Sequence, residues 1–490
     1  MEADDSQDWA LEHFGGLELG DARRTARAVE MAGAAARRPG GRVLDVYLTS
    51  AQRQGAYDFL ENTAIRSEAL VAGIGLAVAG NCETQPYVLV SVDGSSLNLV
   101  DRQGAKGFGI VGNVSKSARG LKVVTAYALQ PNGTPVGVVD QQWWLRGVVP
   151  KDQSWRRRRT TEQKETRYFN QAIEQSARRL EAHAPRTRAW FLLDRESDRR
   201  ATIELLRGMN QHWFTIRSNH NRRILNRVER SGPLGHRRIF RNVRKRSFID
   251  DALRRAKVWG HLHLEVVAGP GRRARRAKLS VRVVAPYVWL YSQKGPATAA
   301  QMTLVEVREV GTTPRGEEPL CWRLWTNYPV ATFEDATLVI ENYAKRWRIE
   351  DFHKTWKSGA CNVETCQLRS AEAAMKWATI MASVAARIER LKHRSRTEAT
   401  LPASVELSEH EIQALIFFKQ KYKKKTETIP DEMPTLSQAV TWLAEIGGYM
   451  GPRVAGGPPG SITIRRGLEH IRPGALIFES IASEHRKKKR

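Results

Sequence analysis

Residues 343–357 read YAKRWRIEDFHKTWK and contain the spacing Y-x2-R-x3-E-x6-K with no Gly or Pro. On a helix that turns about 100° per residue, one face within about 60° of arc would carry a phenol, two cations and a carboxylate: Tyr343, Arg346, Glu350 and Lys357. A carboxylate can hold a metal ion, and neighbouring cations can bind phosphate oxygens. An exposed face with an ordinary ion pair between Arg346 and Glu350 would show the same spacing. Charge alone does not separate these two interpretations.

Two upstream segments each end an apolar run with an aspartate. Residues 87–92 form a short apolar, β-rich run that is followed by Asp93 and a Gly/Ser turn. Residues 189–193 form a second such run, which is followed by Asp194. Each pattern predicts a buried strand with a carboxylate at its exit. Taken alone, an Asp at a strand end is more often a turn former or a helix cap.

Together, Asp93, Asp194 and the helical Glu350 are the parts of a site that holds two divalent cations for phosphoryl transfer. Hydrolysis of a phosphodiester needs an activated water, an in-line geometry and neutralisation of a crowded anionic centre. Two Mg²⁺ ions about 3.5–4 Å apart meet these three needs, and Mg²⁺ uses few carboxylates because it retains waters. We find no P-loop, Ser-His-Asp triad or zinc motif of useful specificity that competes with this interpretation.

The same residues resemble those of a known family. Asp93, Asp194 and Glu350 resemble the D, D and E of the DDE transposases, which have a ribonuclease-H-like core. Residues 194–198 are similar to the D-R-E-A-D signature around the second aspartate, and residues 343–357 match the Y-R-E-K signature of the insertion-sequence-four group. The resemblance covers nearly the whole chain, and Gly94 stands where a member of the group has Thr.

The resemblance implies a metal site and a DNA-binding surface. Asp93 would bridge two Mg²⁺ ions, Asp194 would bind one ion and Glu350 the other, and Mn²⁺ would substitute for Mg²⁺. The DNA-contacting residues would be Tyr343, Arg346, Lys357, Lys354, Trp322, Arg217, Arg23, Arg24 and Arg27. Trp322 matches the family's base-pocket tryptophan by its offset from Tyr343, although a core tryptophan on a strand would also fit.

The implied reaction has four steps. Hydrolysis frees a 3′-OH, that hydroxyl attacks the opposite strand to make a DNA hairpin, hydrolysis opens the hairpin, and the end is joined to target DNA. A tight hairpin forces a base to flip out, and the flipped base needs an aromatic platform. The implied partners are double-stranded DNA, as transposon inverted ends and as target DNA, and a second copy of the chain in a homodimer on two ends.

The charge of the chain agrees with a nucleic-acid partner. The 490 residues include 79 Lys and Arg against 52 Asp and Glu, which gives a formal net charge of +27. This excess favours a polyanion, although ribosome association or nonspecific binding would fit the same charge. Arg23, Arg24 and Arg27 follow a possible helix start at Gly20-Asp21, where phosphate and groove contacts are favourable. A solvated cationic face would explain these three arginines equally well.

The four cysteines form no CxxC pair, so we expect reduced thiols rather than a zinc site. The N-terminus lacks the apolar region of a secretory signal, and no run of about eighteen apolar residues predicts a membrane span. We therefore expect a cytoplasmic protein without a membrane partner. By resemblance, the host would be a bacterium.

We expect an α/β fold with a ribonuclease-H-like catalytic core between two helical parts. Residues 1–66 would be the transposon-end DNA-binding domain, 67–395 the catalytic domain with a β-rich insertion at about 218–330, and 396–490 a helical dimerisation domain with a basic tail. Between residues 222 and 278, 18 Lys and Arg stand against four acids, which suits contact with a phosphate backbone. In the core we expect a helix at about 163–182, and strands at 87–92, 96–100, 122–129, 135–139 and 189–193. Asp93 and Asp194 would then lie on adjacent central strands.

Two classes of function fit these observations. The first is an enzyme that cuts and joins DNA, and the second is a DNA-binding regulator or inhibitor that retains a transposase fold. The presence of all three acids and of the first 60-odd residues favours the enzyme. A plain nuclease is a third possibility, which the end-binding and dimerisation segments disfavour.

Overall fold

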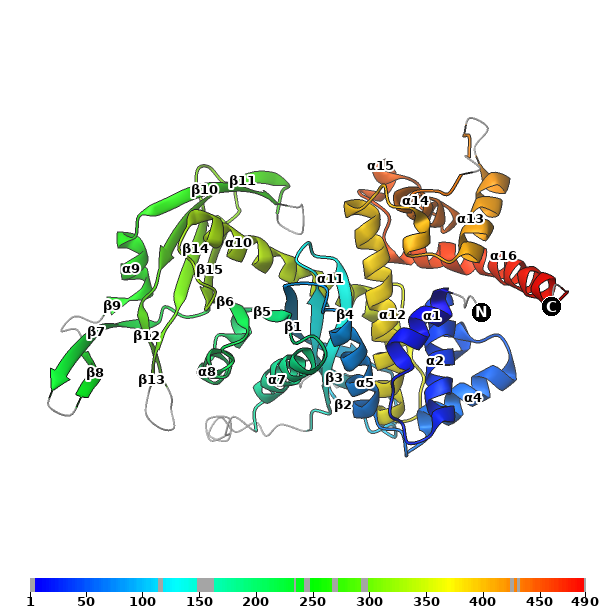
Figure 1. Cartoon of the computed structure of the whole chain (residues 1–490), viewed down its shortest axis with the longest axis horizontal. Coiled ribbons are helices and arrows are strands. Elements are labelled where there is room, and N and C mark those ends of the chain that lie inside the picture. The colour runs from blue at the N-terminus through cyan, green and yellow to red at the C-terminus, as the bar shows by residue number, and fades with distance from the viewer. Residues whose placement is uncertain are drawn as a thin grey trace.

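The structure, a computed structural model, describes residues 5–112, 118–147, 163–232, 235–241, 247–266, 272–291, 298–423, 427–429 and 432–488. Figure 1 shows a β-rich part on one side, a central sheet, and two groups of helices on the other side. The long helix α12 (Ala371–Thr397) runs between the central sheet and both groups of helices.

The N-terminal part is helical, as predicted. It consists of α1 (Asp5–Phe14), α2 (Ala22–Arg37), α3 (Val43–Val46) and α4 (Ser50–Glu61). The predicted helix start is correct: Asp21 is the N-cap of α2, and its side chain accepts a hydrogen bond from the backbone N–H of Arg23. These helices share one hydrophobic core with the central sheet and α12, so they are packed on the core rather than tethered to it.

A ten-stranded mixed sheet forms the centre of the molecule, in the order β10-β11-β14-β15-β6-β5-β1-β3-β2 with β4 paired to β3. The first half of the sheet and its helices are α5 (Ser67–Gly80), β1 (Tyr87–Asn98), β2 (Gly109–Ile110), β3 (Arg119–Leu129), β4 (Pro135–Trp144), α7 (Thr166–His183), β5 (Arg188–Leu193), η2 (Arg195–Ser197), α8 (Arg200–Gly208) and β6 (Trp213–Arg217). β1 pairs in parallel with β5 and antiparallel with β3. The predicted adjacency of the two aspartate-bearing strands is therefore confirmed.

One expectation for β1 is wrong. The strand does not end before Asp93 but continues to Asn98, so residues 96–98 extend the same strand instead of starting another. The Gly/Ser segment remains extended because β3 pairs with it as far as Asn98 opposite Gly120. Glycine at position 94 leaves room for the ring of Phe169 on α7, because a Cβ on residue 94 would stand only 3.1 Å from that ring.

The Arg-rich stretch is β-rich, but it is not a separate body. It contains β7 (Arg223–Gly232), β8 (Gly235–Arg241), β9 (Ser247–Phe248), α9 (Ile249–Arg255), β10 (Val258–Val266), β11 (Arg275–Val284), β12 (Tyr287–Leu290), β13 (Thr298–Gln301), β14 (Thr303–Glu309) and β15 (Cys321–Thr326). β15 pairs with β6, so β10, β11, β14 and β15 extend the central sheet. The other strands form a second, five-stranded sheet.

The segment 343–357 is helical with a break. α10 (Phe333–Ala344) is followed by a 3₁₀ turn, η3 (Lys345–Trp347), and then by α11 (Arg348–Lys357). Tyr343, Arg346 and Glu350 therefore belong to three consecutive elements and not to one regular helix. A tighter turn at this position changes the direction in which Arg346 points relative to an ideal helix.

Helix α12 holds the parts of the protein together. The buried Lys376 ammonium donates to the carbonyl oxygens of Leu60 and Asn62, both at 2.8 Å. The Trp377 indole N–H donates to the carbonyl of Gly41 at 2.8 Å. These contacts fix the N-terminal helices on the core.

The C-terminal part has a hydrophobic core of its own. Its elements are η5 (Ala403–Val405), α13 (Glu409–Tyr422), α14 (Leu436–Ile446), α15 (Pro452–Ala455) and α16 (Ser461–Lys488), with η4 (Val363–Thr365) preceding α12. The predicted basic tail begins inside α16, and residues 489–490 lie outside the described residues. Within the described residues, no helix combines the length and the apolar character that a bilayer crossing requires.

Candidate active site

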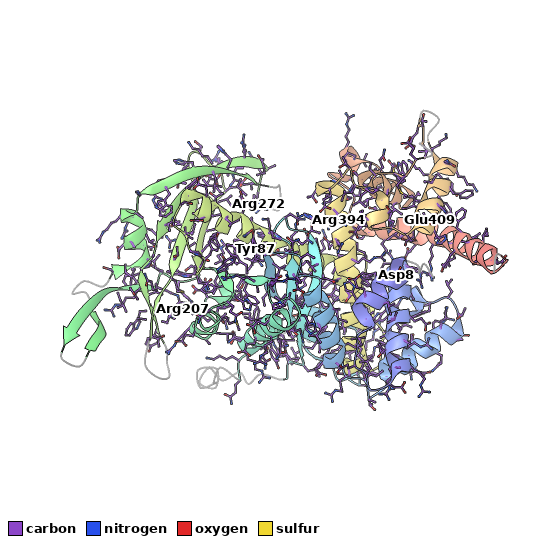
Figure 2. All side chains as sticks on the ribbon, in the orientation of Figure 1. Asp8, Tyr87, Arg207, Arg272, Arg394 and Glu409 are labelled. Atoms are coloured by element: carbon purple, nitrogen blue, oxygen red, sulfur yellow. The ribbon has the colours of Figure 1, made fainter. Side chains whose placement is uncertain are left out.

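Three carboxylates from distant parts of the sequence converge beside the central sheet. Val92 of β1 lies opposite Leu193, the last residue of the parallel strand β5. Asp93, which is still within β1, and Asp194, which directly follows β5, therefore lie side by side. Glu350 lies in the first turn of α11, and α11 packs against β1. Figure 2 labels Tyr87, the first residue of β1, in the middle part of the molecule, and Asp93 lies six residues further along the same strand.

Arg346 joins two of these carboxylates. Its Nη1 lies 3.5 Å from Oδ2 of Asp93, and its Nη2 lies 2.9 Å from Oε1 of Glu350. The residue is only 7% exposed. The i,i+4 ion pair between Arg346 and Glu350 is present as predicted, but the expectation of an ordinary exposed pair is wrong for Arg346, which is buried and also faces Asp93. Nε of Arg346 is also buried and has no hydrogen-bond partner among the described residues.

Asp93 is held in an unfavourable environment for a negative charge. The pKa of Asp93 is raised to about 6, and burial is the main cause. The negative charges of Asp194 and Glu350 raise this pKa further, whereas the positive charge of Arg346 lowers it. The backbone N–H of Gly94 donates to Oδ1 of Asp93 at 2.8 Å. Asp194 accepts the backbone N–H of Glu196 at 2.9 Å, which makes it the N-cap of η2. Each aspartate thus has one oxygen oriented by the backbone.

The structure also brings Tyr343, Trp322 and Arg217 together. The rings of Trp322 and Tyr343 meet edge to face with centroids 5.7 Å apart. Tyr343 is buried, which raises its pKa, while the nearby charges of Arg346 and Arg217 act in the opposite direction. Trp322 is half-buried on β15, so part of its side chain remains accessible.

The remaining predicted DNA-contacting residues lie elsewhere. Lys354 is exposed on α11, and Lys357, at the end of α11, lies 3.8 Å from Glu364. Arg23, Arg24 and Arg27 lie on α2, in the N-terminal helices, away from the carboxylates.

Each α2 arginine has a partner within the protein. Arg23 pairs with Asp21 at 2.8 Å, and Arg24 donates to the carbonyl of Leu19 at 2.9 Å. Arg27 pairs with Glu30 at 2.6 Å. Of the three, only Arg23 is well exposed, with 92% of its side chain accessible.

A second ion pair supports the site and was not predicted. Asp198 is 1% exposed, and its Oδ1 lies 2.6 Å from Nη2 of Arg222. Its Oδ2 accepts the backbone N–H of Asn219 at 2.8 Å, which ties the turn after Asp194 to the end of β6. The sequence contained one signal, the last aspartate of the D-R-E-S-D segment, but the motif did not identify its partner Arg222.

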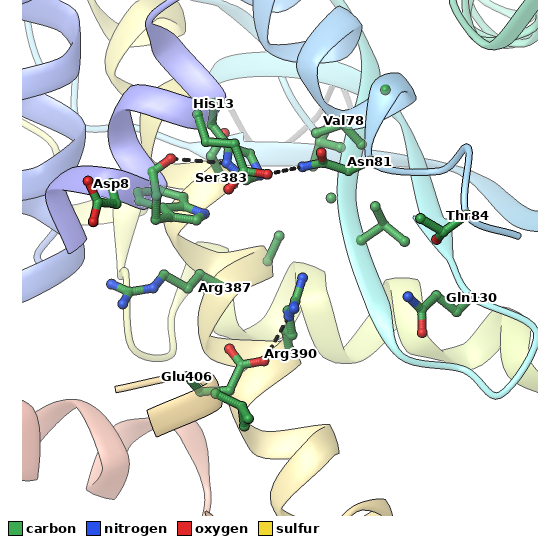
Figure 3. Close-up of a pocket in the computed structure, with 18 residues that line it drawn as sticks. Asp8, His13, Val78, Asn81, Thr84, Gln130, Ser383, Arg387, Arg390 and Glu406 are labelled. Carbon is green, nitrogen blue, oxygen red and sulfur yellow. Dashed lines mark hydrogen bonds and ion pairs between the residues drawn. The ribbon is translucent and has the colours of Figure 1, made fainter. Parts of the chain in front are cut away.

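A cavity of about 450 Å³ lies at a different place, where α1, α5, β4, α12 and η5 meet (Figure 3). Its polar side chains pair with one another: Asn81 donates to Glu12 at 2.6 Å, and Arg390 donates to Glu406 at 2.8 Å. None of the predicted site residues lines this cavity. The carboxylate cluster therefore remains the candidate active site.

Two protein-family models match parts of the chain. Residues 6–65 match the family described as transposase DNA-binding, and residues 159–386 match the transposase DDE domain. The second match includes Asp194 and Glu350, while Asp93 lies upstream of it. The chain thus carries a transposase DNA-binding domain and a DDE transposase domain, which support its assignment as a DNA transposase, with DNA as its partner.

DDE transposase domains generally depend on divalent metals, so we asked whether the three acids suit such an ion. Among the described residues, no three His, Cys, Asp or Glu side chains stand close enough to share one metal ion. The Arg346 guanidinium supplies the positive charge between Asp93 and Glu350 instead. The donor set nevertheless fits, because carboxylate oxygens are the ligands that Mg²⁺ prefers and the three negative charges repel one another.

We predict that Asp93→Asn stabilises the protein above about pH 6. Because the pKa of Asp93 is raised to about 6 in the folded state, the folded protein retains a proton that the unfolded chain releases near pH 4. Stability is therefore lost as the pH rises from about 4 to 6, by at most about 3 kcal/mol, and the Asn variant avoids this loss. Thermal melting at pH 4 and pH 7.5 measures the difference.

The matched control is Asp351→Asn, which changes an exposed acid next to Glu350. It should show no such gain between the two pH values. A wild type that melts at or above the temperature of Asp93→Asn at pH 7.5 would contradict the prediction.

Proposed function

We propose that the protein is a cut-and-paste DNA transposase of the insertion-sequence-four group, similar to the transposase of the kanamycin-resistance composite transposon (transposon five). It binds transposon ends, cleaves them by metal-dependent hydrolysis through a DNA hairpin, and joins the 3′ ends to target DNA. The observation that carries the proposal is the buried Arg346 between Asp93 and Glu350, with Asp194 beside them, in a chain with a DDE transposase domain.

The three acids are the proposed metal ligands. Asp93, Asp194 and Glu350 would hold two Mg²⁺ ions, or Mn²⁺ in their place, with Asp93 shared between the ions. When bound, such ions activate water and neutralise charge on the reacting phosphate. Carboxylates must be ionised to act as ligands, so the raised pKa of Asp93 makes ion binding weaker below about pH 6.

Arg346 has a second role in this proposal. A guanidinium presents donors in a planar fork that matches a phosphate group. In the protein alone, two of its nitrogens face carboxylates and Nε has no partner among the described residues. With DNA present, Arg346 turns from the carboxylates to the phosphate being cut, and the acids become available for cations.

The proposed reaction has four steps. Water attacks the phosphate at the transposon end, the phosphodiester breaks, and the 3′ oxygen leaves and takes a proton. The released 3′-OH then attacks a phosphate of the opposite strand and displaces the 3′ oxygen of the flanking DNA, which takes the proton, and the hairpin forms. A second water attacks the hairpin phosphate and releases the 3′-OH again. This 3′-OH finally attacks a phosphate of the target DNA and displaces a 3′ oxygen of the target strand, which takes the proton. Arg346, Tyr343 and Lys357 would orient the phosphates in each step.

Trp322 is the proposed platform for the flipped base. It is half-buried, and its ring meets edge to face the ring of Tyr343, which is three residues before Arg346. Arg217, whose charge reaches Tyr343, would contact the same DNA strand.

End recognition is assigned to residues 1–66, and assembly to residues 396–490. Arg23 is the best placed of the three α2 arginines for a phosphate, because it is the most exposed. Two copies would assemble on two ends and each would cut the end that the other binds. A net charge of +27 disfavours association of the proteins until DNA neutralises it.

The test is cleavage of labelled end DNA in Mg²⁺ by the wild type and by Asp93→Ala, Asp194→Ala and Glu350→Ala. We expect each variant to lose nicking and strand transfer by more than a hundredfold, because each acid holds metal and not DNA, while end binding in a gel shift remains. Asp351→Ala is the matched control on the same helix and should cut at the normal rate. If one alanine variant cuts DNA at the normal rate, its residue is not part of the active site. If the wild type binds transposon ends but does not cut them, the protein is better explained as a DNA-binding regulator that retains a transposase fold.

A mixture of two inactive variants tests whether two copies of the chain act together in a dimer. Asp194→Ala is combined with a full-length chain whose end binding is removed by substitution of Arg23, Arg24 and Arg27, each protein being inactive alone. Restored cutting is expected if the copies act across a dimer. If both proteins are folded and the mixture stays inactive, the assembly is not as proposed.

The variant Trp322→Ala distinguishes a role of Trp322 in stacking on the flipped base from a role in the hydrophobic core. It should spare the first nick and slow hairpin formation and opening about five- to hundredfold, since base–aromatic stacking contributes about 1–3 kcal/mol. A time course on pre-nicked ends measures these steps, and Trp322→Phe should recover part of the rate. Trp325→Ala on the same strand is the contrast, because Trp325 is fully buried and its loss should lower the melting temperature and every step alike. Equal hairpin rates for the wild type and Trp322→Ala would remove the platform role.

A further inference from the structure

Two buried polar side chains continue the row of the central sheet that contains Asp93. Thr125 of β3 lies directly opposite Asp93, and Gln141 of β4 lies directly opposite Thr125. Residues that face each other across an antiparallel pair share one face of the sheet, with Cβ atoms about 4.5–5.5 Å apart. Thr125 is fully buried, Gln141 is 4% exposed, and Asp93 is the half-buried outer member of the row.

This row lies on the face of the sheet that α11 covers. On β3, Tyr127 stands two residues from Thr125, and its ring stacks on Phe352 of α11 at 4.7 Å. On β4, the ring of Trp143, two residues from Gln141, also packs against α11. Alternate residues of a strand point to the same face, so Thr125 and Gln141 point toward α11. The same helix carries the glutamate of the carboxylate cluster.

The polar atoms of Thr125 and Gln141 have no partner within the described residues. Oγ1 of Thr125 and both Nε2 and Oε1 of Gln141 are buried without a hydrogen bond. Buried polar groups are nearly always hydrogen-bonded in native proteins, and an unpaired one costs free energy. A hydroxyl can donate one hydrogen bond, and a side-chain amide can donate two. The row therefore holds unused donors beside the carboxylate of Asp93.

The contacts that orient Asp93 in the protein alone include one that the proposed reaction removes. The backbone N–H of Gly94 donates to Oδ1 of Asp93, and Nη1 of Arg346 lies 3.5 Å from Oδ2. When Arg346 turns to the phosphate being cut, Oδ2 loses this partner. Carboxylates that bind metal ions are themselves held by hydrogen bonds from neighbouring groups, which fix their direction.

We propose that Thr125 is a positioning residue for Asp93. Its hydroxyl donates a hydrogen bond to the Asp93 carboxylate when Arg346 has turned to the DNA. The side-chain amide of Gln141 donates in turn to the Thr125 oxygen, so that the single hydroxyl proton is directed at Asp93. The proposal rests on the proposed function, because it takes Asp93 to be a metal ligand. It adds a buried support that does not itself contact DNA.

The test is the affinity of the protein–DNA complex for Mn²⁺, measured by electron paramagnetic resonance of the free ion with end DNA that is already cleaved. Asp93→Ala in the same complex defines the binding that depends on Asp93. Loss of a group that orients a metal ligand typically weakens metal binding about 10- to 100-fold, and we expect this loss for Thr125→Val. Thr125→Ser keeps the hydroxyl and should bind Mn²⁺ nearly as the wild type does. Gln141→Met should show a smaller loss than Thr125→Val.

The matched control is Ser176→Ala on α7. Ser176 is fully buried, and its hydroxyl also has no partner among the described residues. However, α7 packs on the opposite face of the sheet, where its Phe169 faces Gly94, the neighbour of Asp93. Ser176→Ala therefore removes a buried hydroxyl without touching the row of Asp93, and Mn²⁺ binding should not change.

Melting and cleavage separate positioning from a role in the fold. The Thr125 hydroxyl has no partner in the protein alone, so Thr125→Val should not lower the melting temperature of the DNA-free protein. In cleavage assays Thr125→Val should raise the Mn²⁺ concentration that gives half the maximal rate. The KM for end DNA should not change, because Thr125 is fully buried.

Unchanged Mn²⁺ affinity in Thr125→Val would overturn the proposal, and so would an equal loss in Thr125→Ser. A marked drop in the melting temperature of Thr125→Val would assign the hydroxyl to the fold instead. If the wild-type complex has no Mn²⁺ binding that Asp93→Ala removes, the proposed metal site fails and this proposal fails with it. Binding that Asp93→Ala removes and Thr125→Val retains would contradict this proposal alone.

Discussion

The centre of the molecule depends on the charge balance around Arg346. A guanidinium that is 7% exposed lies between Asp93 on a strand and Glu350 on a helix, with Asp194 on the neighbouring strand. Partly buried carboxylates cost free energy when no cation compensates them, and carboxylates placed close together also repel one another. Arg346 offsets part of this cost, yet the pKa of Asp93 is still raised to about 6. The single positive charge of Arg346 therefore does not fully compensate the carboxylates. A divalent cation between them would compensate the negative charge further and stabilise the site.

The position of Arg346 depends in turn on how α11 is held. The ring of Phe352 stacks on Tyr127 of β3 at 4.7 Å, and the Trp356 indole donates to the carbonyl of Ala378 on α12 at 2.9 Å. α11 is thus fixed between the sheet and α12. The same helix α12 binds the N-terminal helices through Lys376, so the transposase DNA-binding domain and the carboxylates share one rigid frame. Bound DNA would therefore be placed by the fold and not by a flexible linker.

The sequence predicted the members of the site better than their arrangement. The apolar runs before Asp93 and Asp194 identified two buried strands, and their adjacency followed from the expected fold. The continuation of β1 to Asn98 was missed because pairing with β3, a non-local contact, keeps a Gly/Ser segment extended. Periodicity placed Tyr343 and Glu350 on one helix face, but it could not show the 3₁₀ turn between them. The extension of the central sheet through β15 was missed for a related reason. The pairing of β15 with β6 is a contact between distant segments, which the local sequence of a strand does not reveal.

The central claim is that the three carboxylates form a cation site which Arg346 vacates when DNA binds. A structure of the protein with uncleaved end DNA and Mn²⁺, with Mn²⁺ located by its anomalous scattering, tests this most directly. The account predicts Mn²⁺ coordinated by Asp93, Asp194 and Glu350, with the Arg346 guanidinium against a DNA phosphate. Mn²⁺ bound elsewhere, with Arg346 still between Asp93 and Glu350 in the presence of DNA, would contradict it.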